Sequence, residues 1–312
     1  MIDNKNNISF FIPAYNCSST ITEAVESILN TNFTYGDELV IVNDFSTDNT
    51  GEILNGLQQK YPHLIVLHHK RNKGGGAARN TAVENSKHEL LFCLDADNVL
   101  EHHSIKQLKD FMIAQQAEVA SFHELRYFSE STSAVDETWP FKPGVFSVDD
   151  LLRGELSPGA SGNYLFTKRS WQKAGGYTED LGALDTWSFA FKQLMEKCKM
   201  VVMPDGYYFH RRGHESYYLR DAWNRRRSVS LRLIKLIINY IDLLNPDDVN
   251  YIFSKKGRYS WFDNLKKQPI RLLDKTQTAN SVWSDHQIKK PLKEKISYYI
   301  ARIFQRLNRF GK

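Results

Sequence analysis

The first hundred residues alternate between apolar runs of strand length and segments with helical spacing. The apolar runs stand at residues 8–12, 38–42, 64–68 and 90–94. A polar turn and then a helical segment follow each of the first three, at about 20–29, 51–60 and 74–80. Ser19 or Thr20 is expected to cap the first of these helices. This alternation, at roughly thirty-residue intervals, is typical of a parallel, doubly wound α/β sheet.

The pattern changes in the second half of the chain. After about residue 120 the segments are short, aromatic and punctuated by Pro and Gly, and helical spacing dominates from about residue 221. We therefore predict an α/β domain over residues 1–218 and a mainly helical C-terminal extension over residues 219–312. The longest apolar stretch, Leu231 to Leu244, is broken by charged residues and is too short to span a bilayer.

Composition indicates an ordinary globular protein. Hydrophobic residues make up 41% of the 312 residues and charged residues 25%, and no apolar signal sequence opens the chain. Three widely separated cysteines suit reduced thiols, so we expect a cytoplasmic protein. The formal net charge of +5 belongs to the tail, because residues 289–312 hold eight Lys or Arg and one Glu. The rest of the chain is slightly negative and is not expected to bind nucleic acid.

The end of the chain has the pattern of an amphipathic helix. From Ile296 onward the apolar residues fall on one arc and basic residues line its flank. This pattern predicts that residues 293–312 lie on anionic lipid, at the inner face of the plasma membrane. The alternative is a helix docked on the body of the protein or on a second subunit, and the sequence leaves the oligomeric state open.

Two carboxylates follow the fourth apolar run. Asp95 and Asp97 are separated by one small residue and stand where the predicted strand ends. The carboxyl edge of an α/β sheet is where ligands bind, and residues at i and i+2 of an extended chain point the same way. The two acids are therefore predicted to converge on a hard cation such as Mg²⁺ or Mn²⁺. Two solvated acids before a turn are the alternative.

Two other turns offer complementary chemistry. Tyr15, beside the rigid Pro13, can stack on a nucleobase, and Asp44 can accept a hydrogen bond from a base N–H. Taken singly, these residues can equally be a packed aromatic and a helix cap. The turn Lys73–Arg79 combines flexible glycines with positive charge suited to phosphates. Neither Gly-x-Gly-x-x-Gly after the first strand nor a P-loop is present, which excludes the usual dinucleotide and ATP-hydrolysing sites.

Four motifs stand in register along this part of the chain. They are Ile8–Asn16 (ISFFIPAYN), Val42–Thr50 (VNDFSTDNT), Asn72–Asn80 (NKGGGAARN) and Asp95–Asp97 (DAD). Together they resemble the family 2 glycosyltransferases of the GT-A fold, and the resemblance continues to Asp185 and fades after about residue 216. It implies a Rossmann-like, mostly parallel sheet flanked by helices and a UDP-sugar as donor substrate. The donor-binding residues that it implies are Pro13, Ala14, Tyr15, Asn16, Asp44, Lys73, Gly74, Arg79, Asp95, Ala96, Asp97, Arg211 and Arg212.

The resemblance also implies a divalent cation. Asp97 would hold Mn²⁺ or Mg²⁺ between the donor phosphates, with Asp95 beside it. His210 or His214 would complete the shell of ligands, within a loop that closes over the diphosphate in many relatives. A structural role for either histidine is the alternative.

Asp185 is the predicted general base. It occupies the place of the second acid in a Glu-Asp pair of the family, whereas Leu184 stands in the place of the first. This departure affects the predicted acceptor contacts more than the chemistry. Asp180 and Glu179 are nearby competitors, and Asp185 could instead cap the helix that follows it.

These observations predict an inverting transferase. It would move a sugar from a UDP-sugar to a hydroxyl of a glycan or a lipid-linked saccharide, in bacterial surface polysaccharide synthesis. One alternative is a sugar-1-phosphate nucleotidyltransferase, which would need a Gly-rich basic loop directly after the first strand, where Pro13–Asn16 stands instead. The other alternative is a nucleotide-sugar-binding protein without activity.

Overall fold

The computed structural model describes residues 7–212 and 229–273 and divides the chain into two compact units. The first unit contains residues 1–151 and 155–226, and the second contains residues 152–154 and 227–312. The domain boundary predicted at residue 218 lies outside the described residues and stays a prediction.

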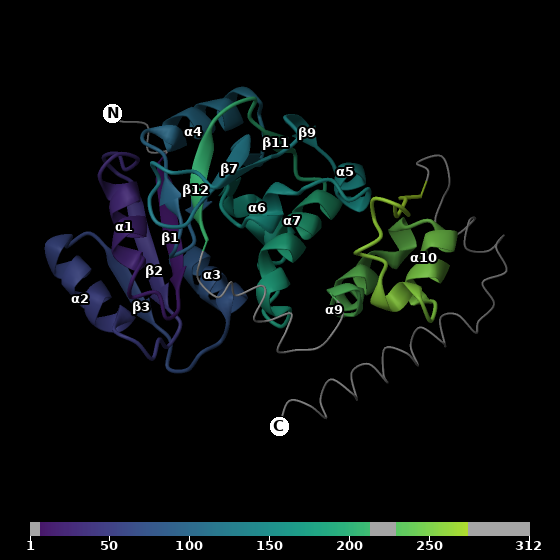
Figure 1. The fold of residues 1–312 in the computed structure, drawn as a ribbon, viewed down its shortest axis with the longest axis horizontal. Coiled ribbons are helices and arrows are strands. Elements are labelled where there is room, and N and C mark those ends of the chain that lie inside the picture. Colours follow the sequence, from purple (N-terminus) through teal and green to yellow (C-terminus); the bar gives the residue numbers. More distant parts are fainter. Residues whose placement is uncertain (1–6, 213–228, 274–312) are drawn as a thin grey trace. The chain divides into compact units, whose positions relative to one another are not determined.

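An eight-stranded sheet forms the centre of the first unit (Figure 1). Its strands are β1 (Ile8–Ala14), β2 (Glu38–Asn43), β3 (Ile65–His68), β4 (Leu90–Cys93), β6 (Val119–Ser121), β9 (Gly144–Phe146), β10 (Leu165–Thr167) and β11 (Met200–Val202). They follow the order β3-β2-β1-β4-β10-β6-β11-β9, and β3, β2, β1 and β4 run parallel. β10 inserts antiparallel between β4 and β6. The predicted α/β fold with a mostly parallel sheet is confirmed.

The helices of the first unit alternate with the strands. They are α1 (Ile21–Leu29), α2 (Thr50–Lys60), α3 (Gly75–Glu84), α4 (Ser104–Ala114), α5 (Val148–Leu152), α6 (Lys168–Lys173) and α7 (Asp185–Met195). α1 shows why they form, because it buries Ile21, Ala24, Val25 and Ile28, which are spaced three and four residues apart along one face. The four elements β1 to α2 thus follow the apolar pattern of the sequence.

The loops that carry chemistry meet at the carboxyl edge of this sheet. The N–H of Asp44 donates to the carbonyl of Ala14 at 2.8 Å, so the turn after β2 continues the pairing with β1. Thr20 precedes α1, but its hydroxyl makes no cap and instead donates to the carbonyl of Ala96 at 2.9 Å. Of the two predicted caps, Ser19 and Thr20, Thr20 stands at the N-cap position, but its hydroxyl links the start of α1 to the turn after β4 instead of capping the helix.

A second, four-stranded sheet lies in the same unit and was not predicted. It has the order β5 (Val99–Leu100), β12 (Tyr207–Arg211), β7 (Glu124–Phe128) and β8 (Glu137–Pro140). One face packs around a small apolar cluster of Val99, Phe128 and Phe209. Because β5 begins directly after the acidic turn, this sheet extends from the same part of the molecule.

The described part of the second unit is helical. It contains α9 (Val229–Ile237), a 3₁₀ segment Ile238–Leu243, α10 (Pro246–Phe253) and a short 3₁₀ turn Gly257–Tyr259 around the fully buried Trp261. The apolar stretch Leu231–Leu244 is therefore not one α-helix. The α-helix changes to a 3₁₀-helix after residue 237, and the backbone becomes extended at Leu244, shortly before Pro246. Among the described residues no helix has the length and hydropathy of a membrane span. The predicted lipid-binding segment 293–312 lies outside them.

Candidate active site at the carboxyl edge of the main sheet

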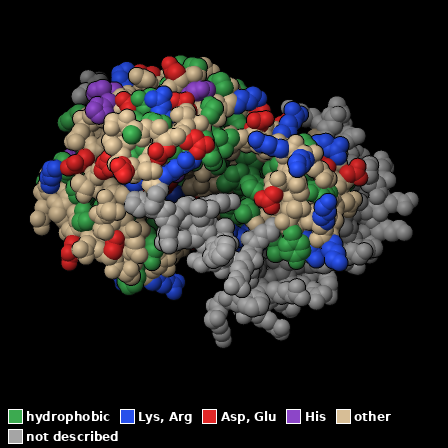
Figure 2. All heavy atoms as spheres, viewed as in Figure 1, with side chains coloured by type: hydrophobic (Ala, Val, Ile, Leu, Met, Phe, Trp, Pro, Cys, Tyr) green, Lys and Arg blue, Asp and Glu red, His purple; other side chains and the backbone are tan. Residues whose placement is uncertain are grey.

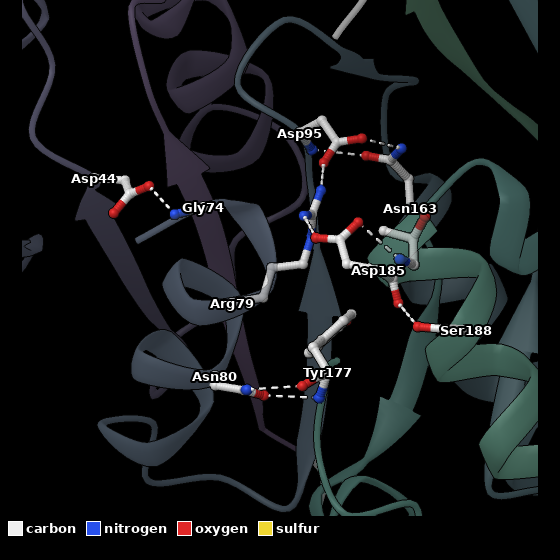
Figure 3. A network of polar contacts seen from close by, with 10 residues as sticks. Asp44, Gly74, Arg79, Asn80, Asp95, Asn163, Tyr177, Asp185 and Ser188 are labelled. Carbon is white, nitrogen blue, oxygen red and sulfur yellow. Dashed lines mark hydrogen bonds and ion pairs between the residues drawn. The ribbon is translucent and has the colours of Figure 1, made fainter. Parts of the chain in front are cut away.

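A buried guanidinium joins two acids that are far apart in the sequence. α3 positions Arg79 so that Nη2 contacts Oδ1 of Asp95 at 2.6 Å and Nη1 contacts Oδ2 of Asp185 at 2.7 Å (Figure 3). Burial raises the pKa of Asp185, whereas Arg79 acts in the opposite direction. Asp185 opens α7, and its Oδ1 accepts the N–H of Thr186 at 2.8 Å. The predicted base is thus held at the site, and it also satisfies one amide of the helix start.

Asn163 fixes the first acid of the motif. The N–H of Asp95 donates to Oδ1 of Asn163 at 2.7 Å, and Nδ2 of Asn163 donates to Oδ2 of Asp95 at 3.1 Å. The same Nδ2 also donates to the carbonyl of Ser161 at 2.5 Å, and the Asn163 side chain is fully buried. The pairing of Asn163 with Asp95 depends on β10 lying next to β4.

The two acids of the motif do not lie on an extended chain. β4 ends at Cys93, and residues 95–98 form a turn in which the N–H of Asn98 donates to the carbonyl of Asp95 at 3.1 Å. The prediction of an i, i+2 strand geometry was wrong because the strand ends at Cys93, two residues before Asp95. Burial and the neighbouring Asp95 raise the pKa of Asp97 to about 6. The carboxylates are therefore close enough to repel one another.

The charges of the site favour a cation. Asp95 and Asp185 contact the guanidinium of Arg79, and the charge of Asp95 also acts on Asp97. The nearby Arg211 is paired with Glu23. Among the described residues of this cluster, carboxylates therefore outnumber guanidiniums. A cation bound near Asp97 would relieve the repulsion that raises its pKa.

The residues fit an ion held jointly with a substrate. Within residues 7–212 and 229–273 no three His, Cys, Asp or Glu side chains form a ready-made metal cage. Mg²⁺-type ions are often held by one or two carboxylates together with substrate phosphates, so such a cage is not required. Asp97 suits this role, whereas the carboxylate of Asp95 already accepts hydrogen bonds from Arg79 and Asn163.

Asp44 shapes the glycine-rich turn. Its carboxylate accepts the N–H of Lys73 at 2.9 Å and of Gly74 at 2.7 Å, and it lies 2.6 Å from Nδ1 of His69. These partners lead directly into α3 and hence to Arg79 (Figure 3). The predicted contact between Asp44 and a nucleobase stays a prediction, because this buried carboxylate already has three protein partners.

Exposed aromatic rings stand on the two turns beside Asp44. Tyr15 is 47% exposed, and Phe45, which the sequence analysis missed, is 51% exposed. Phe45 has a φ of +62° and Asn16 a φ of +49°, a backbone region that costs non-glycine residues about 1–3 kcal/mol. Asn16 is held there by Oδ1, which accepts the N–H of Thr47 at 2.8 Å. The sequence does contain a signal for Phe45, because it is an aromatic residue inside an otherwise polar turn.

The remaining predicted donor residues differ in accessibility. Pro13 is half-buried, Ala14 is buried, and the side chain of Lys73 is exposed. Ala96 is buried and offers its carbonyl to Thr20 rather than to a ligand. Their roles stay predictions.

The end of β12 is attached to the acidic turn. Asn98 accepts the N–H of Arg211 at 3.1 Å, and Nε of Arg211 donates to the carbonyl of Asp97 at 3.1 Å. Burial lowers the pKa of His210, which favours the neutral imidazole. Arg212 pairs with Glu137 on β8. His214 lies outside the described residues, so its predicted role as a metal ligand stays a prediction.

Replacing Asn163 with alanine is expected to destabilise the protein by about 1–3 kcal/mol, because the buried N–H of Asp95 loses its partner. The loss should appear as a lower midpoint in urea unfolding. Asn85→Ala, at the exposed end of α3, is the matched control and should stay within about 0.5 kcal/mol of the unaltered protein. Equal midpoints for the two variants would contradict the role of Asn163.

A family model described as glycosyl transferase family 2 matches residues 9–173, more than half of the chain. The chain belongs to this family. The match covers Asp44, Arg79, Asp95 and Asn163 but ends before Asp185. The family match therefore does not include the predicted base of this family 2 glycosyltransferase. Only the structure places Asp185 beside Arg79.

Relatives and solved structures agree with this family. A poly(ribitol-phosphate) beta-glucosyltransferase of Bacillus spizizenii is 32% identical over 114 residues, which is 36% of this chain and 18% of that protein. The structure of S. aureus TarS 1-349 in complex with UDP-GlcNAc has a TM-score of 0.61 at 18% identity, covering 96% and 81% of the two chains. The mannosyltransferase PcManGT from Pyrobaculum calidifontis in complex with GDP-Man and Mn²⁺ has a TM-score of 0.53 at 19% identity, covering 75% and 64%. This chain thus spans less than a fifth of the Bacillus relative.

Proposed function

We propose that this protein is an inverting glycosyltransferase that moves a sugar from a UDP-sugar to a hydroxyl of a glycan. The observation that carries the proposal is that Arg79 joins Asp95 and Asp185 at the carboxyl edge of the sheet, with Asp97 close enough to Asp95 to feel its charge. Family membership and this cluster together favour transfer over a purely structural role, since buried acids with excess negative charge are costly unless they serve a ligand.

The donor half of the site would hold the nucleotide. Tyr15 and Phe45 offer exposed rings for a base, and the glycine-rich turn held by Asp44 lies between them and Arg79. The UDP-GlcNAc bound by TarS supports a uridine nucleotide, whereas the GDP-Man of PcManGT shows that the fold also accepts guanine. We infer that the nucleotide is UDP, and calorimetry can compare the affinities for the two bases.

Asp97 would hold a divalent ion against the donor phosphates. Such an ion, like the Mn²⁺ of PcManGT, supplies positive charge where the leaving UDP becomes negative. Asp97 contributes a half-buried carboxylate directed by the turn of residues 95–98. Asn163 and Arg79 keep Asp95 in place beside it.

Asp185 would accept the proton of the acceptor. The acceptor oxygen attacks the anomeric carbon, the bond from that carbon to the phosphate oxygen breaks, and its electron pair leaves with UDP. The proton passes to the carboxylate of Asp185, whose burial raises its pKa and so increases its strength as a base. A single displacement of this kind inverts the configuration.

The acceptor class follows from relatives. The Bacillus relative is a poly(ribitol-phosphate) glucosyltransferase, which supports a role in bacterial surface polymer synthesis. We propose a glycan or a lipid-linked saccharide as the acceptor, with the basic tail of residues 293–312 bringing the protein to anionic membranes. Cytoplasmic placement belongs to the same proposal.

Calorimetry on the full chain tests the donor assignment. UDP and UDP-GlcNAc are expected to bind in the presence of MnCl₂ and at least tenfold more weakly in EDTA, because the phosphates and Asp97 share the ion. GDP is the matched probe for the base, because it differs from UDP in the base alone, and it should bind more weakly than UDP. Equal binding with and without the metal, or a preference for GDP, would contradict the assignment.

A further inference from the structure

A row of rings crosses one face of the four-stranded sheet. Tyr208 and His210 are two residues apart on β12, so their side chains lie on the same face of the sheet. The register places His210 opposite Tyr127 of β7, which lies on this face too. The ring centroids of Tyr208 and His210 lie 6.3 Å apart, those of His210 and Tyr127 lie 5.1 Å apart, and those of Tyr127 and Trp139 lie 5.1 Å apart. We call these four residues the aromatic row.

The inner end of the aromatic row touches the candidate active site. Tyr208 is fully buried, and its phenol lies near Ser161 and Asn163, the residue that holds Asp95. Nδ1 of His210 lies 3.3 Å from Nδ2 of Asn98, in the acidic turn. The charge of Asp95 also acts on both rings of β12. The row therefore starts at the acids that the proposed function uses.

The outer end of the row is exposed and polar. Trp139 is 37% exposed on β8, all of whose residues are exposed. Its Nε1–H donates to Oε1 of Glu137 at 2.6 Å, and Glu137 also pairs with Arg212. The guanidinium of Arg212 lies 3.9 Å from the centroid of Tyr127. Two rings, an acid and a guanidinium thus stand together at the surface.

The outer end of the row is not needed to hold the sheet. The opposite face already packs around Val99, Phe128 and Phe209. Strand β8 contributes exposed residues only, so an exposed Trp139 adds little to the core. Large aromatic residues that keep one face in solvent beside fixed hydrogen-bonding groups are typical of binding surfaces.

We propose that the outer end of the aromatic row is the acceptor subsite, where a neutral sugar ring stacks on Trp139 while Glu137 and Arg212 bind its hydroxyls. Tyr127 stands edge to face against Trp139 and holds that ring in place. A neutral sugar fits because Glu137 and Arg212 compensate each other's charge and leave no excess for a polyanion. The buried inner end of the row connects this subsite to Asn163, which holds Asp95. This inference rests on the proposed function, since it assigns the second substrate of the same reaction.

Acceptor-stimulated UDP release from UDP-GlcNAc with MnCl₂ tests the subsite. The probes are chitotetraose, cellotetraose and maltotetraose as neutral glycans, and a chondroitin tetrasaccharide as an anionic one. At least one neutral probe should accelerate UDP release. Trp139→Ala should raise the KM for that probe about tenfold or more, with a much smaller change in the KM for UDP-GlcNAc. Trp139→Phe should recover most of the loss.

Tyr35→Ala is the matched control, because Tyr35 is an equally aromatic residue that is 89% exposed and lies before β2, at the amino end of that strand. It should behave like the unaltered protein. Stimulation by the anionic probe alone, stimulation by no probe, or an unchanged acceptor KM in Trp139→Ala would overturn the subsite. Failure of the unaltered protein to bind UDP-GlcNAc would instead overturn the proposed function, so the two failures are distinguishable.

Discussion

Asp185→Asn is expected to lower kcat by about 10²- to 10⁴-fold while UDP-GlcNAc still binds, because the variant cannot accept the proton of the acceptor. The amide keeps the size of the side chain and can still accept the N–H of Thr186. Turnover measured at saturating donor and acceptor, together with calorimetry for the donor, separates the chemical step from binding. Unchanged turnover would show that another group is the base.

The same substitution also removes one half of a buried ion pair. Arg79 would keep Asp95 as its ionic partner, and breaking a buried pair by removing one partner costs about 3–5 kcal/mol. Loss of activity is therefore informative only at temperatures where circular dichroism shows the variant folded. Asp180→Asn is the matched control, since Asp180 is an exposed acid in the preceding loop. A larger fall in kcat for Asp180→Asn than for Asp185→Asn would move the base to Asp180.

The parallel half of the fold could be predicted because its pattern is local. Each strand of the first hundred residues is an apolar run bounded by polar turns, and β2, for example, occupies Glu38–Asn43 where residues 38–42 were predicted. The turns after β1, β2 and β4 meet because parallel strands end at one edge. Asp44 and Asp95 follow β2 and β4, and Arg79 lies in the helix after β3, so all three belong to this edge, while their roles stay predictions.

The contacts within the site could not be predicted in the same way. Arg79 and Asp185 are 106 residues apart, and Asn163 lies 68 residues from Asp95. These pairs form only because β10 inserts next to β4 and α7 packs near α3. Such tertiary neighbours cannot be predicted from the spacing of apolar residues along the chain. The four-stranded sheet was missed for a related reason, since two-residue and four-residue strands such as β5 and β8 give no apolar pattern.

The acidic turn shows how a short motif can be identified while its geometry is predicted wrongly. The pattern at Asp95 and Asp97 correctly indicated acids at a strand end, but the strand stops at Cys93. The resulting turn gives the two acids different surroundings: Asp95 is fixed by Arg79 and Asn163, whereas Asp97 has its pKa raised by burial and by Asp95. This difference is why we propose that the cation binds Asp97 rather than both acids equally.

Asp97→Asn should abolish the effect of Mn²⁺ on UDP binding and lower kcat/KM by on the order of 10³-fold, because the ion loses its protein carboxylate. Asp110→Asn, an exposed acid on α4, is the matched control and should leave the metal effect intact. At neutral pH the folded protein should gain stability from Asp97→Asn, since it no longer carries a carboxylate whose pKa folding raises. A destabilised variant would therefore contradict the repulsion between Asp95 and Asp97.

The pH dependence gives an independent test of the same residue. The pKa of Asp97 is raised from 3.8 to about 6, so the carboxylate is protonated as the pH falls below about 6, and a protonated acid does not hold a divalent ion. Mn²⁺-dependent binding of UDP-GlcNAc, whose esterified phosphates do not titrate in this range, should thus weaken between pH 7 and pH 5, and excess Mn²⁺ should shift this loss to lower pH by competing with the proton. Calorimetry at several Mn²⁺ concentrations measures the shift. Because Asp97→Asn lacks this carboxylate, its weak residual binding should stay flat over this range, and a parallel decline in the variant would place the titrating group elsewhere.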